Sequence, residues 1–246
     1  MLPKGVNLRA VALPALLVLA VALTGCLGEY EQVLRPPRAP VQGISVVAVF
    51  PFASWSSDPG LARALTDGVT RALRNSGWYQ VIPPEQVESA MISRRVDTRQ
   101  VTGGQIARQI AQALGADAFI TGIADYYLDD VSMDVPYRVQ STQPSTGTNW
   151  RVSQRTLVIV GMQAQMVRVD SGSVVHRWNG QRRSEVTETR QLNWWSADPP
   201  PRSVIPIPHR RDIPRAREEA IQRAVDAFTA DILPYYEWVP VENSGN

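Results

Sequence analysis

The chain alternates between apolar runs and segments with helical spacing. Residues 44–52 are an almost unbroken apolar run, which is typical of a strand covered on both faces. The next segment places apolar residues three and four apart, at Leu61, Leu65, Val69, Ala72 and Leu73. This spacing predicts a helix, with a cap in Ser56-Ser57-Asp58-Pro59 before it and a stop at Gly77.

The middle of the chain repeats this alternation. Residues 79–82 predict a short strand, and Pro83-Pro84-Glu85 opens a short helix. Thr102 and Gln105 have the spacing of a capping box, so a helix should follow them and end at Gly115. Residues 117–127 predict a third strand.

The last third predicts a hairpin followed by a helix. Residues 157–169 alternate between apolar and polar, and the phase shifts between Met166 and Val167, which predicts a β-bulge. The turn at 170–172 should pair this strand with residues 174–178. A final helix should start near Asp212 or Pro214 and end at Pro234. Its apolar face comprises Ala216, Ala220, Ile221, Ala224, Val225, Phe228 and Ile232.

The order of these elements sets the fold class. Helices alternate with strands early in the chain, and an antiparallel pair comes later. We therefore expect an α/β domain with a mixed sheet and flanking helices, in two or three layers, over residues 44–238.

The N-terminal segment differs from the rest in composition. Lys4 and Arg9 precede an apolar stretch that ends in Leu23-Thr24-Gly25-Cys26. Cys26 is the only cysteine in the sequence. This arrangement resembles the lipobox of bacterial lipoproteins. The resemblance implies a signal peptide at 1–25 that is cut before Cys26, whose thiol carries a covalent lipid. A secreted protein with a single thiol, or an N-terminal membrane anchor, are the alternatives.

Residues 26–43 contain several prolines and no apolar periodicity, so they predict a lipidated cysteine followed by a flexible tether. The signal segment holds two cations and no acid, so the rest of the chain has no formal net charge. Nucleic acid is therefore not an expected partner. With Cys26 acylated, no disulfide can form within the chain.

Residue types that carry catalysis are sparse. His176 and His209 are the only histidines, and no cluster has the spacing of a zinc site. Asp129-Asp130 has no second carboxylate to suit glycoside hydrolysis, and nucleophile-elbow and phosphate-loop motifs are absent. We expect no enzyme, no catalytic residues, no metal and no cofactor.

Short motifs spread over residues 44–233 resemble one family. They are 46–52 with Asp58-Pro59-Gly60-Leu61, 78–82 with Glu85-Gln86-Val87, 114–122, and 167–174. They are similar to the CsgG-like lipoproteins, although Pro83-Pro84 replaces the usual polar pair. That group includes the curli secretion channel subunit, activators of penicillin-binding proteins and the N-terminal domain of TolB. The resemblance implies an α/β docking and assembly domain of the bacterial envelope, and no chemistry.

The predicted insert at 130–155 bears on a possible pore. Residues 131–140 alternate between apolar and polar, and Trp150 and Val152 follow on the return strand. This pattern suits a membrane barrel strand and equally a half-solvated hairpin. Pro136 interrupts the ladder and favours the second interpretation.

A proline-rich loop at 189–213 is the candidate contact surface. Its residues for binding a partner are Trp194, Trp195, Ile205, Ile207, Arg210 and Arg211. Alternatively, the tryptophans rest at the membrane interface, or they cover the sheet edge or one end of the core. Residues 239–246 are expected to form a tail.

The lipobox pattern and the resemblance to the CsgG-like lipoproteins together imply a non-enzymatic lipoprotein that docks in an envelope or secretion complex or regulates peptidoglycan synthesis. Its place should be the periplasmic side of the outer membrane, because Leu27 replaces the aspartate that retains related lipoproteins at the inner membrane. The expected partners are the membrane, through the lipid, and an envelope protein, with a homo-oligomer possible. The alternative is a subunit of an oligomeric CsgG-like secretion pore.

Overall fold

The computed structural model describes residues 30–139, 149–194, 196 and 198–241. The chain divides into two compact units. In the smaller unit, β1 (Tyr30–Arg35) pairs antiparallel with β9 (Tyr235–Pro240), and the Arg35 Nε lies 2.7 Å from Glu237 Oε2. The sequence predicted a flexible tether over residues 26–43. Residues 30–35 of that segment form strand β1 instead. The pairing residues come from the opposite end of the chain, so no local pattern indicated them.

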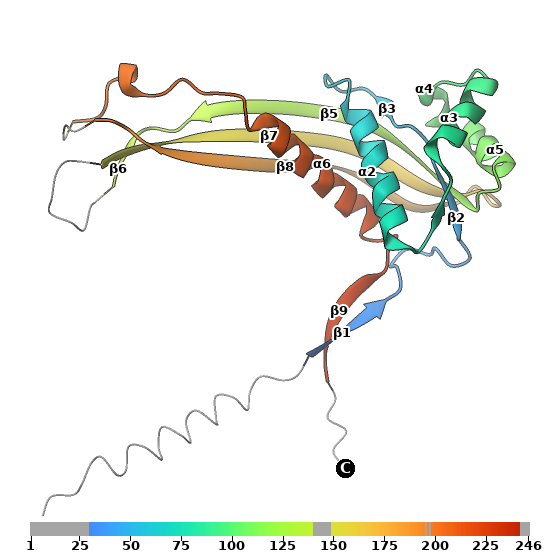
Figure 1. The fold of residues 1–246 in the computed structure, drawn as a ribbon. Coiled ribbons are helices and arrows are strands. Elements are labelled where there is room, and N and C mark those ends of the chain that lie inside the picture. Colours follow the sequence, from blue (N-terminus) through green and yellow to red (C-terminus); the bar gives the residue numbers. More distant parts are fainter. Residues whose placement is uncertain (1–29, 140–148, 195, 197, 242–246) are drawn as a thin grey trace, which may run out of the picture. The chain divides into compact units, whose positions relative to one another are not determined.

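The larger unit, residues 37–234, is built on one mixed sheet (Figure 1). Strand β2 (Val46–Val49) runs parallel to β4 (Gln80–Val81) and to β5 (Ala118–Met133). The antiparallel part consists of β5, β7 (Asn149–Arg168) and β8 (Val174–Gln191). Two short strands complete the sheet. Strand β3 (Ala53–Ser54) runs parallel to β5, and β6 (Tyr137–Val139) runs antiparallel to β7. The predicted α/β fold with a mixed sheet and flanking helices is confirmed.

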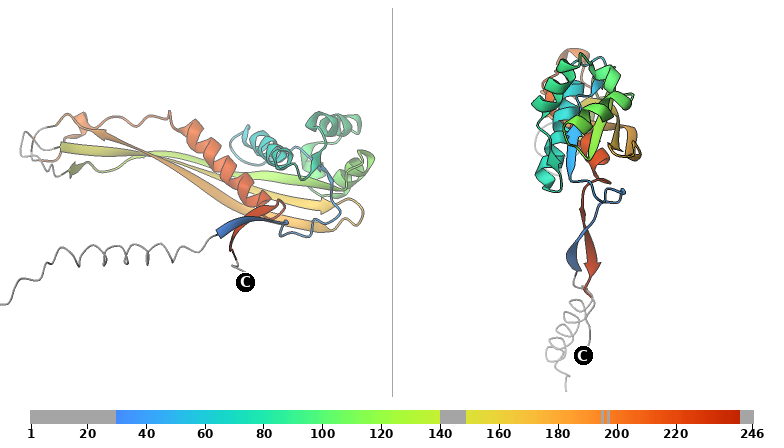
Figure 2. Two further views of the ribbon diagram at one scale, coloured as in Figure 1. Left: turned by 60° about the horizontal axis from the view of Figure 1, so that its bottom comes forward. Right: turned by 90° about the vertical axis from the view of Figure 1, so that its right-hand side faces the viewer.

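Helices cover both faces of the sheet at its β2 end. Helices α2 (Leu61–Ser76) and α6 (Ile213–Thr229) pack on one face, and α6 continues along β7 and β8 (Figure 2). Helices α3 (Pro84–Ser93), α4 (Thr98–Val101) and α5 (Gln105–Ala113) pack on the other face. Val47 and Val49 belong to the first core, and Ala48 and Phe50 to the second. Strand β2 is thus covered on both faces, as predicted.

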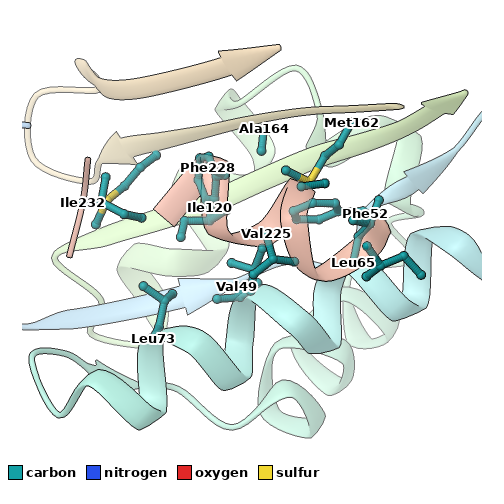
Figure 3. Close-up of a cluster of buried hydrophobic side chains, with 14 of the residues drawn as sticks. Val49, Phe52, Leu65, Leu73, Ile120, Met162, Ala164, Val225, Phe228 and Ile232 are labelled. Atoms are coloured by element: carbon teal, nitrogen blue, oxygen red, sulfur yellow. The ribbon is translucent and has the colours of Figure 1, made fainter. Parts of the chain in front are cut away.

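The larger core lies between the sheet and helices α2 and α6. Figure 3 shows side chains from β2, β5 and β7 meeting those of both helices. Gly68 allows the close crossing of these helices, because a Cβ there would lie 2.8 Å from Val225 Cγ2. Ala39 and Val41 are also buried in this core, so ordered structure begins before residue 44.

The helix ends differ from two of the predicted caps. Helix α2 starts at Leu61 after Gly60 without a side-chain cap, since Asp58 is bound to the Gly60 amide and to Arg217. The capping box lies at Asp97 and Gln100, where it opens α4, and not at Thr102 and Gln105. Gly77, with φ of 64°, ends α2 as predicted.

Helix α6 ends at Thr229, before the predicted stop at Pro234. The Thr229 carbonyl accepts hydrogen bonds from the amides of Ile232 and Leu233, which closes the chain end in a turn. Ile232 therefore lies beyond the helix but is still fully buried in the core.

The predicted hairpin is confirmed, but its two strands are longer than predicted. Strands β7 and β8 pair from Arg151↔Gln191 to Val167↔Val174, and their register shifts between Met166 and Val167, where the phase change predicted a bulge. Strand β5 pairs with β7 as far as Met133, well past the predicted end at 127. Among the described residues, no helix has the length and apolar character needed to span a membrane.

Candidate docking surface

The proline-rich segment lies over the far half of the sheet, on the face that α6 also covers. A small apolar cluster forms there from Trp150, Val152 and Leu192, and further side chains pack against it: Met133, Trp194, Val204 and Ile205. The Trp194 indole Nε1 donates to the Asp198 carbonyl at 2.8 Å. Trp194 and Ile205 were predicted to bind a partner, but they pack within the chain. For these two residues, the alternative of covering one end of the core is the better interpretation.

A buried glutamine holds the end of this segment to β7. Gln154 is 3% exposed. Its Nε2 donates to the His209 carbonyl at 2.9 Å, and its Oε1 accepts from the His209 amide at 2.9 Å. Together the two bonds imitate one step of a β-ladder. A signal for this contact existed in the sequence, because Gln154 stands at an inward-facing position between Val152 and Val158.

Glu188 on β8 gathers three basic side chains. Its carboxylate lies 3.1 Å from Arg190 Nε, 2.7 Å from an Arg211 guanidinium nitrogen and 3.1 Å from His209 Nε2. The hydrogen bond from Arg190, with the charges of Arg190 and Arg211, holds the pKa of Glu188 below its usual range. This polar cluster joins the segment to the edge strand β8.

The same cluster contains residue types that can bind a metal ion. The fold brings potential ligand atoms of Glu188, His209 and Asp212 within 4.8 Å of one another, although the sequence predicted no metal site. However, the Glu188 oxygens accept bonds from Arg190 and Arg211, and a guanidinium nitrogen of Arg190 meets His209 Nε2. Two cationic groups therefore stand where a metal ion would have to bind, and the donor set does not fit one.

Arg210 is held by a second acidic group. Its guanidinium pairs with Asp129 on β5, which also accepts a hydrogen bond from the Tyr127 hydroxyl at 3.2 Å. Burial, followed by the Asp129 charge, raises the pKa of Tyr127 to about 12. Asp129 lies within β5 and holds the loop through Arg210.

Between these anchors the side chain of Ile207 remains exposed. Ile207 is 88% exposed, and the side chains of Arg210 and Arg211 are 67% and 63% exposed although both are paired. We call these three residues the Ile207 surface. Trp195 and Cys26, the other predicted site residues, lie outside the described residues.

The predicted insert at 130–155 is a continuation of the main sheet. Residues 131–133 of β5 pair with residues 154–156 of β7, and β6 pairs with residues 149–151. The ladder breaks around Pro136, as predicted. Met133 packs on the Trp150 cluster, while Val135 is 84% exposed. The tip of the insert lies in residues 140–148, outside the described part of the chain.

Replacing Glu188 by glutamine should loosen residues 205–212. Because the pKa of this carboxyl is lowered, its contribution is complete above the ordinary glutamate pKa and is lost as the pH falls through the lowered value. We expect the protection of the His209 amide against hydrogen exchange to fall several-fold in Glu188→Gln at neutral pH. In the wild type the same loss of protection should occur only under acid conditions.

Glu185→Gln is the matched control for that measurement. Glu185 also lies on β8 and pairs with Arg155 at 3.4 Å, but it points away from the proline-rich segment. If both variants change His209 protection equally, Glu188 has no special part in holding the segment.

No protein-family model matches the sequence, and no curated protein matches it. Among solved structures, lipoprotein GNA1162 from Neisseria meningitidis has 16% identity and a TM-score of 0.42, over 57% of this chain and 83% of that one. The LpoB C-terminal domain from Salmonella enterica has 16% identity and a TM-score of 0.38, over 57% of this chain and 85% of that one. The PelC dodecamer from Paraburkholderia phytofirmans has 12% identity and a TM-score of 0.36, over 84% of this chain and 99% of that one. At these identities and TM-scores, none of the likenesses transfers a function to this chain.

Proposed function

We propose that the protein is a non-enzymatic lipoprotein of the cell envelope, anchored by a lipid on Cys26 at the periplasmic side of the outer membrane. Its role is to dock on an envelope protein, in an assembly or secretion complex or as a regulator of peptidoglycan synthesis. The Ile207 surface is the proposed contact. The lipobox pattern at Leu23-Thr24-Gly25-Cys26 supports the anchor.

The observation that carries the docking role is an exposed isoleucine on a segment held on both sides. Two residues before Ile207, Ile205 packs on the Trp150 cluster; two residues after it, His209 is bound by Gln154. Pro206 and Pro208 flank Ile207 and restrict the backbone further. A side chain presented in this way loses little conformational entropy on binding, and that lowers the cost of association.

The neighbouring charges suit the rim of an interface. Arg210 and Arg211 are oriented by Asp129 and Glu188, and both guanidinium groups remain largely open to solvent. Arginine can donate several hydrogen bonds in one plane, so each retains donors for a carboxylate or a carbonyl of the partner. An apolar centre beside oriented arginines is a common arrangement of residues that dominate binding energy.

Photo-crosslinking in living cells tests this surface. A photoreactive amino acid at position 207 should capture a discrete envelope protein, and the same residue at position 92 should capture none. Ile92 is a matched control because it is also an exposed isoleucine, 75% accessible, but lies on α3. Capture from position 92 and none from position 207 would refute the assignment of the docking surface.

A measurement of mass separates this proposal from the pore alternative. The purified lipidated protein in detergent should have the mass of a monomer or a small complex. A stable ring of many copies would instead favour a secretion-pore subunit.

A further inference from the structure

A cavity of about 290 Å³ lies on the sheet face opposite α6. Two rows of paired residues that point to this face form its floor: Thr121, Gln165 and Arg177, then Ile123, Gln163 and Asn179. Thr102, in the turn between α4 and α5, forms one wall. The cavity therefore begins where the helical cover of this face ends. It belongs neither to the Ile207 surface nor to the proline-rich segment.

The hydroxyl of a largely buried threonine lines this cavity and has no partner within the described residues. Thr121 is 2% exposed, and within the described residues its side chain forms no hydrogen bond. The hydroxyl opens on the cavity, so its hydrogen-bond partner there is water or a ligand. The neighbouring Asn179 is exposed, and its amide has no hydrogen bond to the described residues.

The other two amides of the floor are already oriented. Gln163 Nε2 donates to Asp125 at 2.8 Å, which leaves the Gln163 carbonyl oxygen to accept. Arg177 donates to Gln165 Oε1 at 3.2 Å, which leaves the Gln165 amide hydrogens and further guanidinium hydrogens to donate. The cavity thus offers fixed donors and fixed acceptors side by side.

This mixture favours a ligand that both donates and accepts hydrogen bonds. A phosphate or another anion would use the donors and leave the acceptors without a partner from the ligand, and a cation would do the reverse. Sugar hydroxyls both donate and accept, so they can satisfy a threonine hydroxyl, side-chain amides and an arginine together. The volume is at the small end for ligand pockets and suits about one sugar ring.

We propose that this cavity binds one saccharide unit of an envelope glycan, with Thr121, Gln163 and Asn179 contacting its hydroxyl or acylamide groups. Arg177 lies where it would meet a carboxylate if the sugar carries one. The site does not depend on the docking role proposed for the Ile207 surface, since none of its residues is shared.

A titration of the full-length lipidated protein in a sugar-free detergent tests the site. Saturation-transfer NMR with the trisaccharide of N-acetylglucosamine should show saturable binding. Thr121→Val should weaken it about tenfold, because one ligand hydrogen bond is lost while the volume is kept. Its folding should be unimpaired, since the Thr121 hydroxyl bonds to nothing in the described chain.

Thr187→Val is the matched control. Thr187 is exposed on the same face, farther along β8, and pairs with Arg155. This variant should bind the trisaccharide as the wild type does. N-acetylmuramic acid adds a carboxylate, and tighter binding that Arg177→Gln abolishes would place that group at Arg177.

Three outcomes would overturn the proposal. They are no saturable binding of either sugar, equal losses in Thr121→Val and Thr187→Val, and binding of a trialanine peptide in place of the sugars. None of them depends on the crosslinks from position 207, so the saccharide site and the docking surface stand or fall separately.

Discussion

Replacing Cys26 by serine should abolish fatty acylation of the protein completely. Serine has no thiol to acylate, and in the lipobox scheme the chain is cut only before the acylated cysteine. The variant should therefore incorporate no labelled palmitate and should keep residues 1–25, which an intact mass measurement detects. The wild type should carry label and begin at the lipidated Cys26.

Thr24→Ser is the control for this experiment, because it keeps the cysteine and a small residue in the run that precedes it. It should be labelled and cut like the wild type. A wild-type protein with a free thiol, or with its first residues attached, would contradict the anchor. Loss of the acyl chains matters energetically, since each buried CH₂ contributes about 0.8 kcal/mol to membrane binding.

Replacing Phe228 by alanine should lower the free energy of unfolding by about 3–5 kcal/mol. Phe228 is fully buried in the core between α6 and the sheet (Figure 3), and its ring lies 5.4 Å from the ring of His176 on β8. The cavity left behind would be lined by β-strands and helices that cannot close together. Denaturant unfolding of the chain measures the loss.

Trp55→Ala is the comparison for that loss. Trp55 is also a large aromatic residue but is 60% exposed, so its removal should change stability by no more than about 0.5 kcal/mol. Equal effects from both variants would show that the α6 face of the sheet does not form the main core.

Local patterns were sufficient for the β7–β8 hairpin and for the covered strand β2. The phase change at Met166 and Val167 located the bulge, and the turn at 170–172 located the β7–β8 hairpin. The unbroken apolar run of β2 correctly indicated a strand covered on both faces. Periodicity reports which face of an element is buried, and that is a local property.

Capping signals were less dependable than periodicity. Asp58 and Thr102 have the right residue types, but Asp58 binds Arg217 on α6 and Thr102 bonds back to the Arg99 carbonyl. Short polar side chains have several partners within reach, and the surrounding fold decides among them.

The sequence identified part of the candidate docking surface, but not the contacts that depend on distant residues. The sequence singled out the proline-rich segment and Ile207, but it placed Trp194 and Ile205 with them, whereas both pack on the Trp150 cluster. It missed the anchors Gln154 and Glu188, which lie 55 and 23 residues from their partners His209 and Arg211. It also missed the Thr121 cavity, which requires three strands and a turn to meet.

By itself the sequence determined the types of the main elements of the larger unit, the hairpin with its bulge, and the lipobox pattern, because each depends on residues that are neighbours or share one period. Only the tertiary structure decided that β1 pairs with β9, which apolar residues of the loop are buried, and where unpaired polar groups converge. Those outcomes depend on contacts between distant segments, whose free energy exists only once the whole sheet has formed.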